Sequence, residues 1–183
     1  QEQRNLSILF ITHDLRLLSS LTNKIYYMNE GKIQKNSPFL PKITFQKQHS
    51  SLNTILEIKN LSVSYHQGQV VAPCSFTLNK GESLGILGES GSGKTSLCKA
   101  IDALIPAHGK VFINNQSFLD ASSKNKQILR SLIQMVFQNP ISTLNPRHTI
   151  KKAFLESLFF DSSLSKFSKF KWMISVLKDV HLP

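Results

Sequence analysis

One short stretch carries most of the information about the fold of this chain: Gly88-Glu89-Ser90-Gly91-Ser92-Gly93-Lys94-Thr95. It fits the pattern G-x-x-x-x-G-K-[ST], which is the P-loop that cradles the phosphates of a nucleotide. At average amino-acid composition, a chance match in a chain of this length arises about once in a hundred sequences. The stretch therefore predicts a phosphate-binding loop rather than an ordinary Gly/Ser turn.

Each residue type in this loop has a chemical reason. Glycines allow backbone conformations closed to other residues and let the main chain approach a ligand closely. Successive N–H groups then bind anionic oxygens, and the helix that follows adds the positive end of its dipole. Lys94 is expected to reach the β- and γ-phosphates, and Thr95 is expected to offer its hydroxyl to Mg²⁺.

The sequence on both sides of the loop supplies the secondary structure that a P-loop needs. Residues 83–87 form a short apolar run, which is typical of a buried strand. Apolar residues then recur at helical spacing, so residues 95–104 are expected to form a helix. A strand, a glycine-rich loop and a helix in this order predict an α/β fold of the P-loop NTPase type.

The composition limits the class of protein. The chain has 183 residues, 40% of them apolar, and a formal net charge of +11. Its longest apolar runs are only a few residues, so no segment is expected to span a membrane. The lysines are scattered and form no stripe with aromatic residues, so nucleic-acid binding is not expected. Cys74 and Cys98 share no metal or redox spacing and are expected to be reduced thiols.

Hydrophobic periodicity predicts further elements along the chain. Strands are expected at residues 6–12, 24–28, 32–35, 56–58, 61–65, 76–78, 110–113 and 133–137. Helices are expected at residues 15–21 and 124–132, and two more within residues 149–180. The last helix is basic and aromatic. We interpret it as a packed helix with solvated lysines, and the alternative is a helix on a membrane surface.

The order of these motifs resembles the nucleotide-binding domains of ABC transporters, and it is most similar to the ATPase subunits of peptide importers. The resemblance covers most of the chain apart from a linker and the final helices. It rests on Tyr65, on the P-loop region 85–95, on QMVFQNP at residues 134–140, on LNPR at 144–147, on ILFITHDL at 8–15 and on YYMNEGKI at 26–33. It implies an ABC ATPase fold with a β-rich N-terminal subdomain, here incomplete.

The resemblance also implies roles for single residues. Tyr65 would stack on the adenine of ATP, Gln138 would contact Mg²⁺ and the attacking water, and a histidine placed like His13 contacts the γ-phosphate. Each has a structural alternative: Tyr65 and Gln138 as ordinary strand residues, and His13 as a histidine without a catalytic role. The complete expected nucleotide site consists of Tyr65, Gly88, Glu89, Ser90, Gly91, Ser92, Gly93, Lys94, Thr95 and Ser96, with Thr95 and Gln138 also serving Mg²⁺.

Some parts of the family pattern are displaced or missing. The histidine segment comes before the P-loop here, whereas in the family it follows. The sequence contains no Ser-Gly-Gly of a signature motif and no apolar run ending in Asp-Glu, the mark of a Walker B strand. We interpret the chain as a window across two tandem domains of a fused double ATPase. Residues 1–36 would end the first nucleotide-binding domain, residues 37–54 would be a linker, and residues 55–183 would begin the second.

The displaced histidine segment leads to a structural prediction. In this class of P-loop sheet, the switch-histidine strand lies next to the P-loop strand. The linker is long enough to allow this, because eighteen residues can extend to roughly 60 Å. We therefore predict that the strand at residues 6–12 lies beside the P-loop strand, as in a circular permutant, with His13 near Lys94.

Three functions are compatible with the sequence. The first is the energy-coupling ATPase of a peptide-type ABC transporter, which would bind ATP but not hydrolyse it in this chain alone. The second is a non-catalytic nucleotide-binding or interaction module. The third is a P-loop kinase of another family, against which Tyr65 and the segments of Gln138 and His13 argue. The first implies permease subunits and a second nucleotide-binding domain in a head-to-tail dimer as partners, and a peripheral location on the cytoplasmic face of the plasma membrane.

Overall fold

The computed structural model describes residues 6–14, 18, 21–22, 24–35, 53–66, 68–137, 144–157 and 165–181. The chain divides into two compact units, residues 1–133 and residues 134–183. The P-loop lies in the first unit, which mixes strands and helices, so the predicted α/β class is confirmed.

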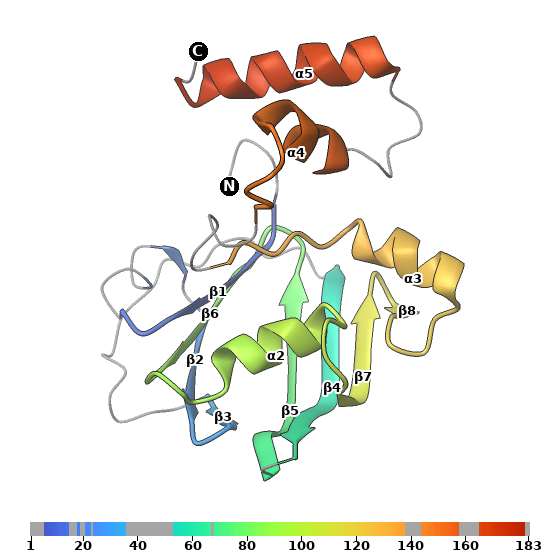
Figure 1. Ribbon diagram of the computed structural model, residues 1–183. Helices are drawn as coiled ribbons and strands as arrows, with labels where there is room; N and C mark the ends of the chain where they lie inside the picture. Colours follow the sequence, from blue (N-terminus) through green and yellow to red (C-terminus); the bar gives the residue numbers. More distant parts are fainter. Residues whose placement is uncertain are drawn as a thin grey trace. The chain divides into compact units, whose positions relative to one another are not determined.

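The P-loop strand is the centre of the first of two sheets in this unit (Figure 1). Strand β6 is buried along its whole length and has a parallel neighbour on each side. An apolar run is what such a position requires, because side chains on both faces of a central parallel strand are covered. The sheet order is β1-β6-β2-β3, with β1 at Ile8–Thr12, β2 at Lys24–Asn29, β3 at Lys32–Gln34 and β6 at Ser83–Gly88.

The pairing of β1 with β6 confirms that the strand of the displaced histidine segment lies beside the P-loop strand, whereas the position of His13 near Lys94 stays a prediction. Thr12 is the register partner of Leu87, the residue before the P-loop begins. On the other side of β6, Met28 of β2 is the partner of Gly88. Residues far from the P-loop in the sequence therefore form both neighbours of its strand.

The second sheet is antiparallel and comes from the β-rich part of the chain. Its first strand is one continuous element where two strands were expected. An irregularity between Ile58 and Leu61 interrupts the pairing, and Asn60 there has a φ of 49°. The sheet order is β5-β4-β7-β8, with β4 at Thr54–Tyr65, β5 at Gly68–Asn79, β7 at His108–Ile113 and β8 at Gln116–Ser117.

A single hydrophobic core joins the two sheets with the P-loop helix. Helix α2, at Lys94–Ile101, contacts β4 and β5 and buries Leu97, Ala100 and Ile101. Tyr26 of β2 meets Phe76 of β5 edge to face, with 6.0 Å between ring centroids. Helix α3, at Ser123–Arg130, begins at the Ser122 cap and adds Leu129 to the core.

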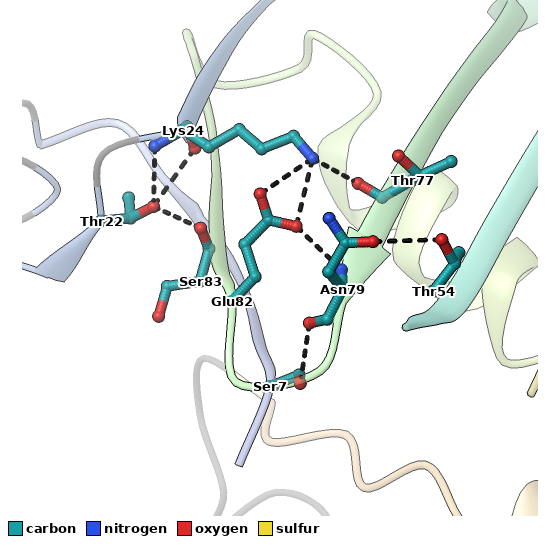
Figure 2. Close-up of polar contacts among 8 residues, drawn as sticks. All are labelled: Ser7, Thr22, Lys24, Thr54, Thr77, Asn79, Glu82 and Ser83. Carbon is teal, nitrogen blue, oxygen red and sulfur yellow. Dashed lines mark hydrogen bonds and ion pairs between the residues drawn. The ribbon is translucent and has the colours of Figure 1, made fainter. Parts of the chain in front are cut away.

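A polar network ties the N-terminal segments to the strands that precede the P-loop (Figure 2). The Lys24 ammonium donates to the Thr77 carbonyl at 2.6 Å and pairs with the Glu82 carboxylate at 3.1 Å. The Thr22 hydroxyl donates to the Ser83 carbonyl, and the Ser7 hydroxyl donates to the Asn79 carbonyl. Ser7, Thr22 and Lys24 are therefore fixed to the segment at residues 77–83 by hydrogen bonds, in addition to the strand pairing of β1 and β2 with β6.

The second unit contains helix α4, at Ile150–Ser157, and helix α5, at Lys166–Asp179. Phe154 and Trp172 join them edge to face, with ring centroids 6.3 Å apart, and Met173 is buried. Lys171 and Lys178 are exposed, but so are Phe167, at 76%, and Trp172, at 44%, so the choice between a packed helix and a helix on a membrane surface stays a prediction. Among the described residues, no helix is both long enough and apolar enough to cross a membrane.

Two further sequence predictions differ from the structure. Residues 133–137 form no strand, although their exposure alternates from residue to residue. Helix α2 ends at Ile101 rather than at residue 104, and a turn follows in which Ala103 has a φ of 51°. The expected helix at residues 15–21 and the expected linker fall mostly outside the described residues.

Candidate functional site

The P-loop begins at the edge of the first sheet where its three parallel strands end. Thr12 pairs with Leu87, so His13 follows at the level of Gly88 on one side of β6. Met28 lies at the same level on the other side. Ligands of α/β proteins bind at this carboxyl edge, because loops and helix N-termini gather there.

The loop has the backbone conformation for which glycine is needed. Gly91 has a φ of 82° and Gly93 a φ of 100°, both in the region that side chains avoid. A Cβ on Gly91 would meet nothing within 4 Å, so the loop is open at this point. Glu89, Ser90 and Gly91 are exposed. The crest of the loop is therefore accessible to a ligand.

Lys94 folds back into the loop. Its ammonium donates to the Gly88 carbonyl at 2.8 Å, the Glu89 carbonyl at 2.6 Å and the Ser92 hydroxyl at 3.3 Å. Burial lowers the pKa of Lys94, because a partly desolvated ammonium is less favourable than a solvated one. The loop therefore holds a positive charge whose present partners are neutral oxygens, and anionic oxygens would satisfy it better.

The predicted adenine-contacting tyrosine lies beside the P-loop helix. Tyr65 ends strand β4, is 47% exposed, and its hydroxyl donates to the Ser96 hydroxyl at 3.4 Å. Thr95, in the first turn of α2, is exposed. The exposed Tyr65 ring, the exposed Thr95 and the loop thus lie together at one end of α2.

The structure brings together most of the predicted site residues. Tyr65, the loop residues 88–95 and Ser96 are adjacent, and His13 lies at the same edge of the sheet. Gln138 lies outside the described residues. The roles assigned to all of these residues stay predictions.

Sequence reasoning missed the residues that support the loop from behind. Gly31, in the turn between β2 and β3, donates its N–H to the Ser92 carbonyl at 3.1 Å. A Cβ on Gly88 would lie 2.2 Å from the Met28 carbonyl oxygen. The strands expected at residues 24–28 and 32–35 imply a turn between them, but nothing local says that this turn touches the P-loop.

The residues present fit a Mg²⁺–nucleotide. The loop offers an ammonium, backbone N–H groups and an open crest, and a hydroxyl follows at Thr95. The described residues contain no group of three or more His, Cys, Asp or Glu side chains that could hold a metal ion on its own. This donor set suits Mg²⁺ that arrives with phosphates, because Mg²⁺ takes much of its coordination from phosphate oxygens and water.

Comparison with known proteins gives a family match and many relatives. The sequence profile of the family "ABC transporter" matches residues 71–183, which is more than half of the chain. The dipeptide transport ATP-binding protein DppF of Haemophilus influenzae is 30% identical over 83% of this chain and 45% of its own length. The oligopeptide transport ATP-binding protein OppD of Bacillus subtilis is 34% identical over 70% of this chain and 39% of its own length.

One relative aligns along the full length of this chain. The ABC transporter ATP-binding protein YejF of Escherichia coli is 28% identical over 100% of this chain and 40% of its own length. The chain thus spans less than half the length of these relatives. Among solved structures, CbiO1 from Clostridium perfringens, part of the ABC transporter complex CbiONQ, has a TM-score of 0.57 over 71% of this chain and 51% of its own. At 23% identity this likeness supports the fold, which is that of an ABC ATPase.

Proposed function

Because this chain belongs to the ABC transporter family, we propose that its P-loop binds Mg²⁺–ATP as the energy-coupling component of a peptide-type transporter. The observation that carries the proposal is the Lys94 ammonium, held inside an open loop by three neutral oxygens. ATP phosphates would take the place of those oxygens, and Tyr65 beside Ser96 would take the adenine. When bound, Mg²⁺ neutralises charge on the β- and γ-phosphates, and the Thr95 hydroxyl would hold it.

Calorimetric titration with ATP, with and without Mg²⁺, tests this binding. Lys94→Ala removes a charge-assisted interaction and should weaken binding about 10- to 100-fold. Lys99→Ala is the matched control, because Lys99 lies five residues further along the same helix, in its last turn. Equal affinities for wild type and Lys94→Ala would refute the proposed role of the loop.

We propose that this chain alone binds ATP without turning it over. Phosphoryl transfer in this family uses Walker B carboxylates and a signature loop from the opposing domain, and neither motif is found in the sequence. Release of inorganic phosphate should therefore stay at background. Steady release by the purified chain that disappears in Lys94→Ala would contradict this. The same absence supports the second candidate, a nucleotide-binding module without catalysis.

We also propose that the parent protein carries two nucleotide-binding domains. Residues 1–36 would be the end of the first domain, residues 37–54 the linker, and residues 55–183 the beginning of the second domain. The support is the alignment of one relative along the whole chain, because it implies that the same order of segments occurs there. Sequencing of the flanking DNA tests this. A P-loop upstream together with a signature and Walker B sequence downstream is the expected result, and the absence of both would reject it.

The same proposal names the partners and location. Permease subunits and a second nucleotide-binding domain would bind the parent protein on the cytoplasmic face of the membrane. The family match and the peptide-transport relatives support this. Co-purification of the parent with permeases encoded beside it is the test, and a parent that remains free of them in mild detergent would argue against the assignment.

A further inference from the structure

The P-loop contacts the hairpin turn, Glu30 and Gly31, which joins β2 to β3. Gly31 donates its N–H to the Ser92 carbonyl at 3.1 Å, and its own carbonyl accepts the Ala72 N–H at 2.8 Å. Through these two backbone hydrogen bonds, Gly31 connects the P-loop to strand β5. This residue precedes the P-loop by about sixty positions and belongs to the segment that the sequence assigns to another domain.

The hydrogen bond at Ser92 sets the direction of a neighbouring donor. The Ser92 carbonyl and the Gly93 N–H belong to the same peptide group, which is planar and trans. In a trans peptide the C=O and N–H bonds point in opposite directions. When Gly31 holds the Ser92 carbonyl toward the hairpin turn, the Gly93 N–H must point away from that turn.

Only a glycine fits at position 31. Its φ is 75°, and a Cβ there would lie 2.3 Å from the Val70 carbonyl oxygen. Gly88 and Gly93, at the two ends of the loop, also pack closely, Gly88 against β2 and Gly93 against β5. A Cβ on Gly88 would meet the Met28 oxygen at 2.2 Å, and one on Gly93 would meet the Val70 oxygen at 2.8 Å. The hairpin turn thus meets the loop through the Gly31–Ser92 backbone hydrogen bond, and backbone atoms of β2 and β5 lie close behind the two end glycines of the loop.

We propose that Gly31 is a positioning residue of the phosphate site: it fixes the Ser92–Gly93 peptide so that the Gly93 N–H faces the phosphates of the nucleotide. The inference rests on the proposed function, because it concerns ligands that carry phosphate. Gly31 acts through the loop and does not itself touch the ligand. The N-terminal segment thereby supports the P-loop of the domain that follows it in the chain.

Two glycine substitutions separate positioning from packing. Gly109→Ala is a close match to Gly31→Ala, because Gly109 has a φ of 111° and its Cβ would lie 2.4 Å from the Asn60 carbonyl oxygen. Both changes should lower the melting temperature. Only Gly31→Ala should weaken binding of ATP and of inorganic tripolyphosphate, by about 5-fold, the effect of one neutral hydrogen bond. Equal binding by both variants would overturn the inference.

A backbone ester at position 31, made by semisynthesis with glycolic acid in place of glycine, covers the case in which Gly31→Ala fails to fold. It removes the donor and adds no atom. Amide hydrogen exchange should then speed up at residues 92–94 and stay unchanged in β6, even without ligand. Unchanged exchange at residues 92–94 would overturn the inference. Faster exchange there in a chain that binds neither ATP nor tripolyphosphate would instead reject the proposed function and leave the positioning of the loop supported.

Discussion

At the scale of the residue, Lys94 links nucleotide binding to pH. Burial holds its pKa below the ordinary value of 10.5, and nearby phosphates would raise it again by stabilising the charged form. Bound ATP therefore favours the protonated lysine. We predict that ATP affinity is constant around neutral pH and falls at alkaline pH. The fall should begin below pH 10.5, because the pKa of Lys94 in the free protein lies below that value. Calorimetry across this range measures it. Lys94→Ala should bind weakly with a flatter profile, and an equally steep profile there would point to another group.

The two cysteines give a second prediction at this scale. Burial raises the pKa of Cys74 to about 11 and that of Cys98 to about 12. The thiolate is the reactive form of cysteine. At mildly alkaline pH both thiols should therefore react with Ellman's reagent at least about 100-fold more slowly than an exposed cysteine. Unfolding in guanidinium should make both thiols react at the rate of an exposed cysteine. Rapid labelling of either thiol in the folded chain would contradict the burial of these side chains.

The residues of the site differ in how far the sequence could predict them. Lys94 and the loop glycines were predictable, because their chemistry lies in eight consecutive positions. Tyr65 was found through a family resemblance, and its placement beside Ser96 depends on the packing of α2 on β4. Gly31 was not predictable as part of the site. Its contact with Ser92 exists only because β2 pairs with β6 in the observed register, which is a long-range property.

At the scale of the element, the ion pair of Lys24 and Glu82 fixes β2 to the turn before β6. The two side chains are 24% and 13% exposed, and the Glu82 carboxylate also accepts the Asn79 N–H. We predict that Lys24→Met lowers the free energy of unfolding by about 1–3 kcal/mol, because the partly buried carboxylate loses its cation. Urea denaturation measures this loss.

The control for that change is Lys59→Met. Lys59 pairs with Glu57 at 3.0 Å, but its side chain is 52% exposed, so the pair is screened by water. This variant should lose no more than about 1 kcal/mol. Equal losses for the two variants would show that the Lys24 pair does not anchor the N-terminal strands.

The secondary-structure elements, like the site residues, differ in how far the sequence could predict them. The strand and helix around the P-loop followed from local periodicity, and α2 proved shorter only at its end. Residues 133–137 carry the alternation of a strand, with Gln134 and Val136 exposed, yet they form no ladder. Alternating exposure satisfies one condition for a strand. The other condition is a neighbouring edge with free backbone groups, and a single sequence does not reveal that.

At the scale of the whole molecule, the N-terminal segment and the P-loop segment share one core. Tyr26 and Phe76 join their sheets, and β6 has one N-terminal strand on each side. Two segments that the sequence predicts to belong to different domains therefore pack into one unit of this chain. The second unit differs, because among its described residues Met173 is the one apolar side chain that is buried, at 5% exposure. Short helices with so little burial are marginally stable by themselves.

We therefore predict that the two units unfold separately. Trp172 is the single tryptophan of the chain and lies in the second unit, so its fluorescence reports that unit alone. The strands of the first unit dominate the circular dichroism near 215 nm. In a urea titration the fluorescence transition should come first and the dichroism transition should follow at a higher concentration.

Two substitutions check the assignment of these transitions. Phe154→Ala removes the ring that meets Trp172 and should move only the fluorescence transition to lower urea. Ile86→Ala leaves a cavity at the fully buried centre of β6 and should cost the first unit about 2–5 kcal/mol. It should therefore move only the dichroism transition. If the transitions coincide in the wild type and both variants shift them together, the two units fold as one. The stability of the P-loop would then depend on helices α4 and α5.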